Sequence, residues 1–282
     1  MSRTVLVLTA TGTTGSATVQ ALVARGATVR AGTRTPATAA VPAGVTAVRW
    51  DYDDASTWGP ALAGVDALYL ALPPFRPDEV AVGTAILAAA KAAGVRRIVK
   101  LSAAGVENAP ESGHRQLEVA IEGSGLAWVH LRPSFFHENF IEFYGHGVKT
   151  DGAIYLPAGT GKTGFIAAAD IGEVAAVALL GDVSGEAWTL TGPESLDHHE
   201  VAERLTAALG RPIRYVEIPE AAFADGLRAH GGNEVAVATM TWLYGMVRAG
   251  WTGGLSPDVQ RVTGRAPLAL GDWAKAHVGA WA

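Results

Sequence analysis

The sequence predicts an α/β protein with a doubly wound parallel sheet. Apolar runs of strand length alternate with helical segments from residue 5 to residue 133, and glycine or proline follows many of these elements. Because the carboxyl ends of parallel strands share one edge of such a sheet, we expect ligands to bind along that edge.

The first half of the chain contains the regular alternation. A strand at 5–8 leads through a glycine turn into a helix that ends at Gly26, and a second strand follows at 28–31. Further strands are expected at 45–50, 67–71, 97–101 and 126–131, with helices at 54–64, 79–93 and 111–122 between them. Asp54 is the expected N-cap of the helix at 54–64.

After Pro133 turns become frequent and the strict alternation fades. We expect helices at 171–180, capped by Asp170, and at 197–209, short strands at 187–190 and 213–216, and several amphipathic helices in 219–282. No low-complexity linker separates the two halves, so two independent domains are not expected.

The turn after the first strand has the context of a dinucleotide-binding fingerprint. Residues 10–15 fit the pattern G-x-G-x-x-G with Ala10 in the first glycine position, followed by Gly12 and Gly15. Small residues let the backbone approach a pyrophosphate, and the helix N-terminus attracts its negative charge. The alternative interpretation is an ordinary strand-to-helix turn.

The residues after the second strand bear on the choice of cofactor. NAD-preferring sites usually place an acidic residue there, whereas this chain has Gly32, Thr33 and Arg34. A guanidinium suits bidentate binding of a 2′-phosphate. We therefore predict NADP as the cofactor, with NADPH preferred over NADH; the alternative is a solvated surface arginine.

Composition excludes several classes of protein. The net charge is −5 without a block of like charges, which argues against nucleic acid or a membrane surface as partner. The chain has no cysteine, which excludes disulfides and thiolate metal sites and is compatible with a reducing cytoplasm. No cleavable leader is expected, since the first residues run directly into a strand. We expect a cytoplasmic monomer or homodimer that acts on a small molecule.

Several segments together resemble the NmrA-like group of atypical short-chain dehydrogenase/reductases. This group includes isoflavone-reductase-like enzymes, NADPH:quinone reductases and NADP-sensing regulators without turnover. The matching segments are TATGTTG at 9–15, Arg34, DYDD at 51–54, KLSAAG at 100–105, SGLAWVHLRPSFFHENF at 124–140, FIAAADI at 165–171, TLTGP at 189–193 and TGRAP at 263–267.

The resemblance implies a Rossmann-type NADP-binding domain at 1–133 and a smaller C-terminal α/β substrate-binding portion at 134–282, of which 163–181 packs back on the first part. In the family's register the first glycine falls at Thr9, which adds a Cβ where close approach is usual. The implied cofactor contacts are Thr9 at that position, Thr11, Gly12, Thr13, Thr14 and Gly15 around the pyrophosphate, Arg34 at the 2′-phosphate, Asp51 and Tyr52 beside the adenine, Ala71, Leu72 and Pro73 along the cofactor, and Ser102 and Pro133 near the nicotinamide.

The proton donor of standard short-chain dehydrogenases is missing. Those enzymes use a Tyr and a Lys four residues later. Here no Tyr occurs between Tyr69 and Tyr144, and no Lys occurs between Lys100 and Lys149. We expect His114, in the helix after Ser102, to be the catalytic candidate together with Ser102 itself. A solvated helix-surface histidine is the alternative, and His130, inside a strand, is expected to be a packed and hydrogen-bonded side chain.

Without a strong general acid, direct hydride transfer suits an electron-poor acceptor. We predict an NADPH-dependent oxidoreductase that reduces a small conjugated carbonyl, quinone or imine. The aromatic-rich segment after Pro133 is expected to hold a flat substrate. The predicted pocket residues are Phe135, Phe136, His137, Asn139 and Phe140, with Phe143 nearby.

Two other functions remain open. One is a redox sensor that binds NADP(H) without turnover and acts through a protein partner. The other is a biosynthetic enzyme that uses the fold for cyclisation or isomerisation with a vestigial cofactor. Both are compatible with the missing dyad.

Two local patterns do not indicate sites. Residues 158–163 end like a P-loop but lack its first glycine, because Leu156 stands there. His198 and His199 point about 100° apart on a helix and cannot easily share an ion, so no metal is predicted.

Overall fold

The computed structural model describes residues 3–282. Within this part of the chain, seven strands form one sheet in the order β3-β2-β1-β4-β5-β6-β8, and each neighbouring pair is parallel. The strands are β1 (Thr4–Val7), β2 (Thr28–Thr33), β3 (Thr46–Arg49), β4 (Ala67–Leu70), β5 (Arg97–Leu101), β6 (Ala127–Pro133) and β8 (Glu186–Leu190). The predicted doubly wound α/β fold is thus confirmed.

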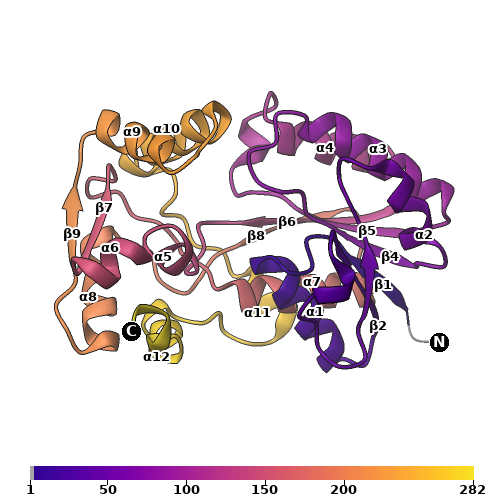
Figure 1. Cartoon of the computed structure of the whole chain (residues 1–282), viewed down its shortest axis with the longest axis horizontal. Helices are drawn as coiled ribbons and strands as arrows, with labels where there is room; N and C mark the ends of the chain where they lie inside the picture. Colours follow the sequence, from indigo (N-terminus) through magenta and orange to yellow (C-terminus); the bar gives the residue numbers. More distant parts are fainter. Residues whose placement is uncertain (1–2) are drawn as a thin grey trace. The chain divides into compact units, whose positions relative to one another are not determined.

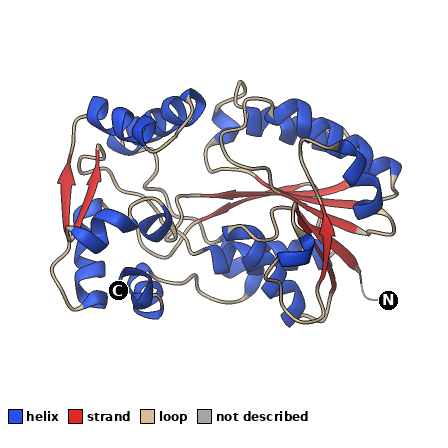
Figure 2. Ribbon diagram, viewed as in Figure 1, coloured by secondary structure: helices blue, strands red, loops and turns tan. Residues whose placement is uncertain are grey.

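Helices cover both faces of this sheet (Figures 1 and 2). On one face lie α2 (Trp58–Leu62), α3 (Glu79–Ala92) and α4 (Gly113–Glu122), whose apolar side chains share a core with those of β4 and β5. On the other face α1 (Thr13–Ala24) packs against α7 (Ala168–Leu180). The two backbones approach so closely that a Cβ on Gly172 would lie 2.5 Å from the Ala17 carbonyl carbon.

The chain forms two compact units. The first unit comprises Met1–Pro133, Ala168–Leu190 and Arg261–Gly264, and the second comprises Ser134–Ala167, Thr191–Gln260 and Arg265–Ala282. The segment that returns to the first unit thus begins after the expected residue 163 and continues beyond 181.

The second unit contains the parallel pair β7 (Ala153–Leu156) and β9 (Arg214–Glu217) with a core of its own. Asp197 and Glu200 form a capping box at the start of α8, and Gly210 ends this helix with a φ of +66°. The helices of this unit are α5 (Asn139–Glu142), α6 (Gly145–Thr150), α8 (His198–Leu209), α9 (Glu220–Ala229), α10 (Glu234–Arg248) and α12 (Leu270–Ala276).

Helix α11 (Asp258–Thr263) spans residues of both units, and short 3-10 helices complete the chain. They are η1 (Pro36–Thr38), η2 (Ala55–Thr57), η3 (Val106–Asn108) and η4 (Val278–Trp281). From residue 3 onward, no helix is long and apolar enough to cross a membrane.

Most predicted elements occur within two residues of their expected bounds. Asp54 caps η2 by accepting a hydrogen bond from the Ser56 backbone N–H at 3.1 Å, as expected. The predicted Asp170 cap is wrong, because α7 begins at Ala168 and Asp170 lies buried in its first turn. Strand β7, whose four residues follow Gly152, was not predicted.

Candidate functional site

The turn between β1 and α1 has the backbone geometry of a glycine motif, although Thr9 stands at its first position. Thr9 has a φ of +48°, in the left-handed region that favours glycine. Two hydrogen bonds hold it there: its hydroxyl donates to the Leu8 carbonyl at 2.7 Å, and the Gly12 N–H donates to the Thr9 carbonyl at 2.8 Å. The threonine therefore adopts the conformation that the motif requires.

Gly15 is the position of this turn that tolerates no side chain. A Cβ on Gly15 would lie 2.0 Å from the Thr9 carbonyl oxygen. Thr11 and Gly12 are exposed ahead of α1, whose first turn has neither an acidic residue nor a side-chain cap. A helix N-terminus reached over small, exposed residues suits a phosphate group. The predicted turn, which also contains Thr13 and Thr14, therefore fits a dinucleotide pyrophosphate.

Arg34 follows β2, on the strand next to that turn. It is exposed, and its guanidinium has no hydrogen-bond or ion-pair partner among residues 3–282. An arginine without a protein partner is available to an incoming anion. Its position fits the predicted contact with a 2′-phosphate.

Tyr52 links two of the predicted cofactor segments. Its hydroxyl donates to the Ala71 carbonyl after β4 at 2.6 Å. Burial raises the pKa of Tyr52, and the interaction with the Thr9 backbone lowers it by less. Asp51 is fixed beside it, since its carbonyl accepts from the Trp58 indole N–H at 2.7 Å. These residues form a hydrogen-bonded rim in which the Tyr52 hydroxyl is already engaged and its ring is half-buried.

Arg76 belongs to this rim and was not predicted from the sequence. Its guanidinium lies 6.0 Å from the Tyr52 ring centroid and forms ion pairs of 2.8 Å with both Asp53 and Asp78. No motif identifies it, because its partners come from two loops. Ala71 is buried and Leu72 and Pro73 are half-buried.

The ends of β5 and β6 bring Ser102 and Pro133 together. The Ser102 N–H donates to the Leu131 carbonyl at 2.7 Å, and the Ala104 N–H donates to the Pro133 carbonyl at 2.9 Å. Both predicted residues are buried where β5 and β6 end. Their pairing continues the parallel register of the two strands, so both lie at the edge where ligands of such sheets bind.

His114 lies at the start of α4 and is partly exposed. Its Nδ1 contacts Glu79 Oε1 and lies 3.5 Å from the Nζ of Lys100. Burial opposes ionisation of Glu79, but the hydrogen bond from His114 and the charge of Lys100 outweigh it, so the pKa of Glu79 is below its usual value. His114 is therefore held by two charged neighbours and is not a solvated surface residue.

A buried carboxylate, Glu118, lies one turn further along α4. It accepts hydrogen bonds from Arg132 at 2.8 and 3.0 Å and from Arg115 at 3.0 Å. Burial disfavours the ionised form, yet the hydrogen bonds from Arg132 and the proximity of Ser102 bring the pKa of Glu118 to about 2. Ser102 thus adjoins a permanently charged network that the sequence alone did not reveal.

Glu118, Glu122 and His130 are close enough to share a metal ion, since their ligand atoms lie within 4.8 Å of one another. The carboxylates already have cationic partners: Arg115 contacts Glu122 at 2.5 Å and Glu118 at 3.0 Å. Guanidinium groups therefore occupy the place of a cation. Burial lowers the pKa of His130 to about 4, and its ring stacks on Trp128 at 4.4 Å, which matches the packing expected there. The expected hydrogen bond is not found among residues 3–282: neither ring nitrogen has a hydrogen-bond partner, and Nε2 lies 3.5 Å from Glu122 Oε1.

The aromatic segment after β6 lies largely in the core of the second unit. Phe140 and His137 are 0% and 1% exposed, and burial lowers the pKa of His137 to about 3. The Phe135 ring packs on Phe165 and Tyr244, with centroids 6.3 and 6.0 Å apart. Phe140 and His137 thus offer a substrate no exposed surface in this structure. Phe136 and Asn139 are half-buried, and Phe143 is exposed.

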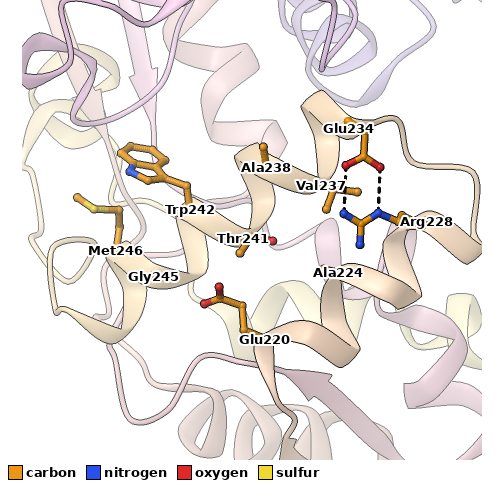
Figure 3. A pocket seen from close by; sticks show the side chains of 10 residues that line it. All are labelled: Glu220, Ala224, Arg228, Glu234, Val237, Ala238, Thr241, Trp242, Gly245 and Met246. Atoms are coloured by element: carbon orange, nitrogen blue, oxygen red, sulfur yellow. Dashed lines mark hydrogen bonds and ion pairs between the residues drawn. The ribbon is translucent and has the colours of Figure 1, made fainter.

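The second unit also has a pocket that was not predicted. It has a volume of about 520 Å³ and lies between α9 and α10. Trp242 and Met246 lie at one end and the Arg228–Glu234 ion pair at the other (Figure 3). The hydroxyl of Thr241 is buried there without a hydrogen-bond partner among residues 3–282. The remaining lining residues are Glu220, Ala224, Val237, Ala238 and Gly245.

Comparisons with known proteins agree with this architecture. A model of the NmrA-like family matches residues 1–250. The chain is 34% identical over 288 residues to an NAD(P)H azoreductase of Xenophilus azovorans, with 98% of this chain and 99% of that protein covered. It is 35% identical over 282 residues to YesF, an uncharacterized oxidoreductase of Bacillus subtilis, covering 98% of this chain and 96% of that one.

A solved structure gives the same fold. An NADPH-dependent quinone oxidoreductase of Escherichia coli in complex with NADPH superposes with a TM-score of 0.84 at 24% identity, with 98% of this chain and 99% of that chain covered. At this identity the likeness establishes the fold.

Proposed function

We propose that this chain, which belongs to the NmrA-like family and is an NAD(P)H-dependent oxidoreductase, uses NADPH to reduce small, flat, electron-poor acceptors. Quinones, conjugated carbonyls, imines and azo compounds form this class. The azoreductase relative supports azo compounds as acceptors, because its sequence aligns with 98% of this chain.

The observation that carries the cofactor preference is the unpartnered Arg34 after β2. No carboxylate stands beside it in the sequence to bind a ribose hydroxyl. The chain's own residues would bind the cofactor in three places: the 11–15 turn at the pyrophosphate, Arg34 at the 2′-phosphate, and Ser102 with Pro133 near the nicotinamide. When bound, the cofactor supplies a hydride.

The residues between the end of β5 and the start of α4 bear on which class of acceptor can be reduced. α4 and the loop that precedes it, which carry Ser102 and His114, contain no tyrosine. A quinone gains two electrons and one proton from the hydride, and a second proton from its surroundings completes the hydroquinone. Conjugation spreads the negative charge formed in between, so positioning contributes more than proton donation.

The second unit has an exposed apolar surface that suits a flat conjugated molecule. Trp242 is 55% exposed and adjoins Met246 in the pocket between α9 and α10. An indole face and a thioether both pack well against flat conjugated rings. This pocket offers a flat molecule the exposed surface that buried Phe140 and His137 do not.

A second candidate function has one observation in its favour. Trp251 and Leu255 are exposed by 72% and 50%, as is Trp242, and exposed apolar side chains suit a protein partner. A sensor of this kind would bind NADP(H) and transfer the signal through that surface without consuming the cofactor.

Anaerobic mixing of the protein with NADPH and a panel of quinones and azo compounds separates the two functions. The reductase consumes NADPH in proportion to the acceptor reduced. We expect Trp242→Ala to raise KM for the acceptor about tenfold, in the range of one lost aromatic contact, and to leave NADPH binding unchanged. Trp251→Ala is the matched control with unchanged KM. NADPH that binds tightly but is oxidised by no acceptor would favour the sensor.

A further inference from the structure

We propose that Lys100, His114 and Glu79 form a proton relay in which Lys100 is the buried proton store and His114 is the outlet. The proposal rests on the reductase function and adds the source of its proton. Lys100 and Glu79 act through His114 and are positioning residues in this scheme.

Three elements of the first unit bring the groups together. Lys100, on β5, is 1% exposed, and its Nζ donates to the Leu101 carbonyl at 3.0 Å and lies 3.5 Å from His114 Nδ1. Glu79 begins α3 and contacts the same Nδ1. Gly113 permits this approach, since a Cβ there would lie 2.7 Å from Glu79 Oε2.

The two partners of Nδ1 require opposite protonation states of that nitrogen. A charged Lys100 donates to Nδ1 only when the nitrogen carries a lone pair, whereas Glu79 accepts from it only when it carries a proton. The site therefore stabilises the His114 ring both before and after a proton reaches Nδ1. The His114 side chain is 42% exposed, so the ring connects buried Lys100 with the outside.

The transfer balances as follows. His114 Nε2–H gives its proton to the oxygen or nitrogen anion that hydride addition creates, and Lys100 Nζ–H gives a proton to Nδ1. Lys100 becomes a neutral amine, and the new Nδ1–H donates to Glu79. Proton uptake from water through Nε2 then restores the ring and the ammonium.

Burial and the surrounding charges give Lys100 a pKa near neutral pH. Burial lowers the pKa of Lys100 to about 8, with Glu79 and Glu118 opposing that decrease and Arg132 adding to it. His130 faces Lys100 across the β5–β6 register and is neutral above its own pKa of about 4, while β4 contributes the apolar Leu70. Lys100 therefore holds its proton at neutral pH and can release it.

The test compares two acceptors that differ in their need for a proton. Hydride addition to para-benzoquinone leaves an anion that must be protonated. Hydride addition to the cationic dye malachite green gives a neutral product without any proton. Lys100→Met removes the store, and Lys100→Arg keeps a charge that cannot be released. Lys91→Met is the control, because Lys91 is exposed on α3 and donates to the Ser124 carbonyl.

Both Lys100 variants should lower kcat for the quinone by about 100-fold at pH 7, at the low end for lost proton donation. The rate of dye reduction should stay within about twofold of that of wild type. In wild type we expect kcat for the quinone to fall above pH 8, and this fall should be absent from both Lys100 variants. Equal losses with both acceptors would overturn the relay and indicate a structural role. NADPH binding and circular dichroism of each variant establish that it has folded.

A turnover-independent measurement keeps the two proposals distinguishable. If wild type reduces neither acceptor, the reductase proposal fails by itself. The relay is then decided by NMR titration of ¹³C-labelled lysine, with Lys100 assigned through Lys100→Met. We expect a Lys100 midpoint near 8 that falls in Glu79→Gln, as the loss of an opposite charge requires. An ordinary lysine midpoint, or no response to Glu79→Gln, would overturn the relay.

Discussion

The two compact units differ in the charged side chains that they bury, although each also buries neutral histidine. In the first unit, buried Glu118 is paired with two arginines, and buried Arg97 donates to the carbonyls of Ala178 and Val183. In the second unit, buried His137 and His198 are neutral near pH 7 and sit among aromatic rings. We infer that the first unit is organised around charge, for an anionic cofactor and a proton, and the second around apolar contact with an acceptor.

We expect the largest loss of stability from a substitution in the core of the second unit. Phe140→Ala should lower the free energy of unfolding by about 3–5 kcal/mol, because its fully buried ring leaves a cavity. Phe143→Ala, three residues later and 58% exposed, should change it by less than about 0.5 kcal/mol. Urea unfolding measures both. Similar losses for the two variants would show that the aromatic segment is not core.

Acid should weaken both units through their buried histidines, since burial lowers the pKa of His130 in the first unit to about 4 as well. The ordinary pKa of histidine is 6.5, and burial lowers that of His198 to about 4. Below pH 6.5 the unfolded chain binds protons that the folded chain excludes, so stability falls as the pH drops from about 6.5 to about 4. The loss is about 1.4 kcal/mol for each pH unit in that window. Glu118 acts lower, since its pKa of about 2 makes its contribution decline only below 4.5.

Replacing the histidine tests this assignment. His198 packs on Phe165 and Tyr215 at 5.6 and 5.5 Å, so His198→Phe keeps a ring in the site. Urea midpoints of this variant measured between pH 4 and 7 should depend less on pH than those of wild type. An unchanged slope would place the acid sensitivity in other groups.

A smaller effect is expected from the cofactor turn of the first unit. Gly15→Ala should lower the free energy of unfolding by about 1–3 kcal/mol, as overpacking does, and should weaken NADPH binding, because its Cβ would collide with the Thr9 carbonyl. Gly59→Ala is the control, since no atom lies within 4 Å of a Cβ there. Thermal unfolding with and without NADPH measures both effects. Equal NADPH affinity in the two variants would contradict a role of this turn in cofactor binding.

The fold could be predicted because the central first-unit strands β1, β4 and β5 are buried along nearly their whole length and therefore form mostly apolar runs. β5 occupies the expected 97–101, whereas β7 was missed although its four residues, AIYL, are an apolar run like that of β4. The predicted cap at Asp170 failed because residues 168 and 169 are alanines, which extend the helix toward the N-terminus.

The site could be predicted only where its residues are adjacent in sequence. The 9–15 turn and Arg34 belong to one strand–helix–strand unit, so spacing identifies them; their role in binding stays a prediction. Lys100, Glu79 and His114 come from three elements whose packing no local pattern encodes. An aromatic-rich segment is equally typical of a pocket and of a core, and the segment around Phe140 belongs to the core.

The central claim is that the first unit is built for a phosphorylated dinucleotide, and calorimetry tests it most directly. Titrations of NADPH and NADH into wild type and Arg34→Ala give four affinities. We expect wild type to prefer NADPH, and Arg34→Ala to lose about 1.5–3 kcal/mol of NADPH binding, the range of a hydrogen bond to a charged group, with NADH affinity unchanged. Equal affinity of wild type for NADPH and NADH, or equal losses of both in Arg34→Ala, would contradict the claim.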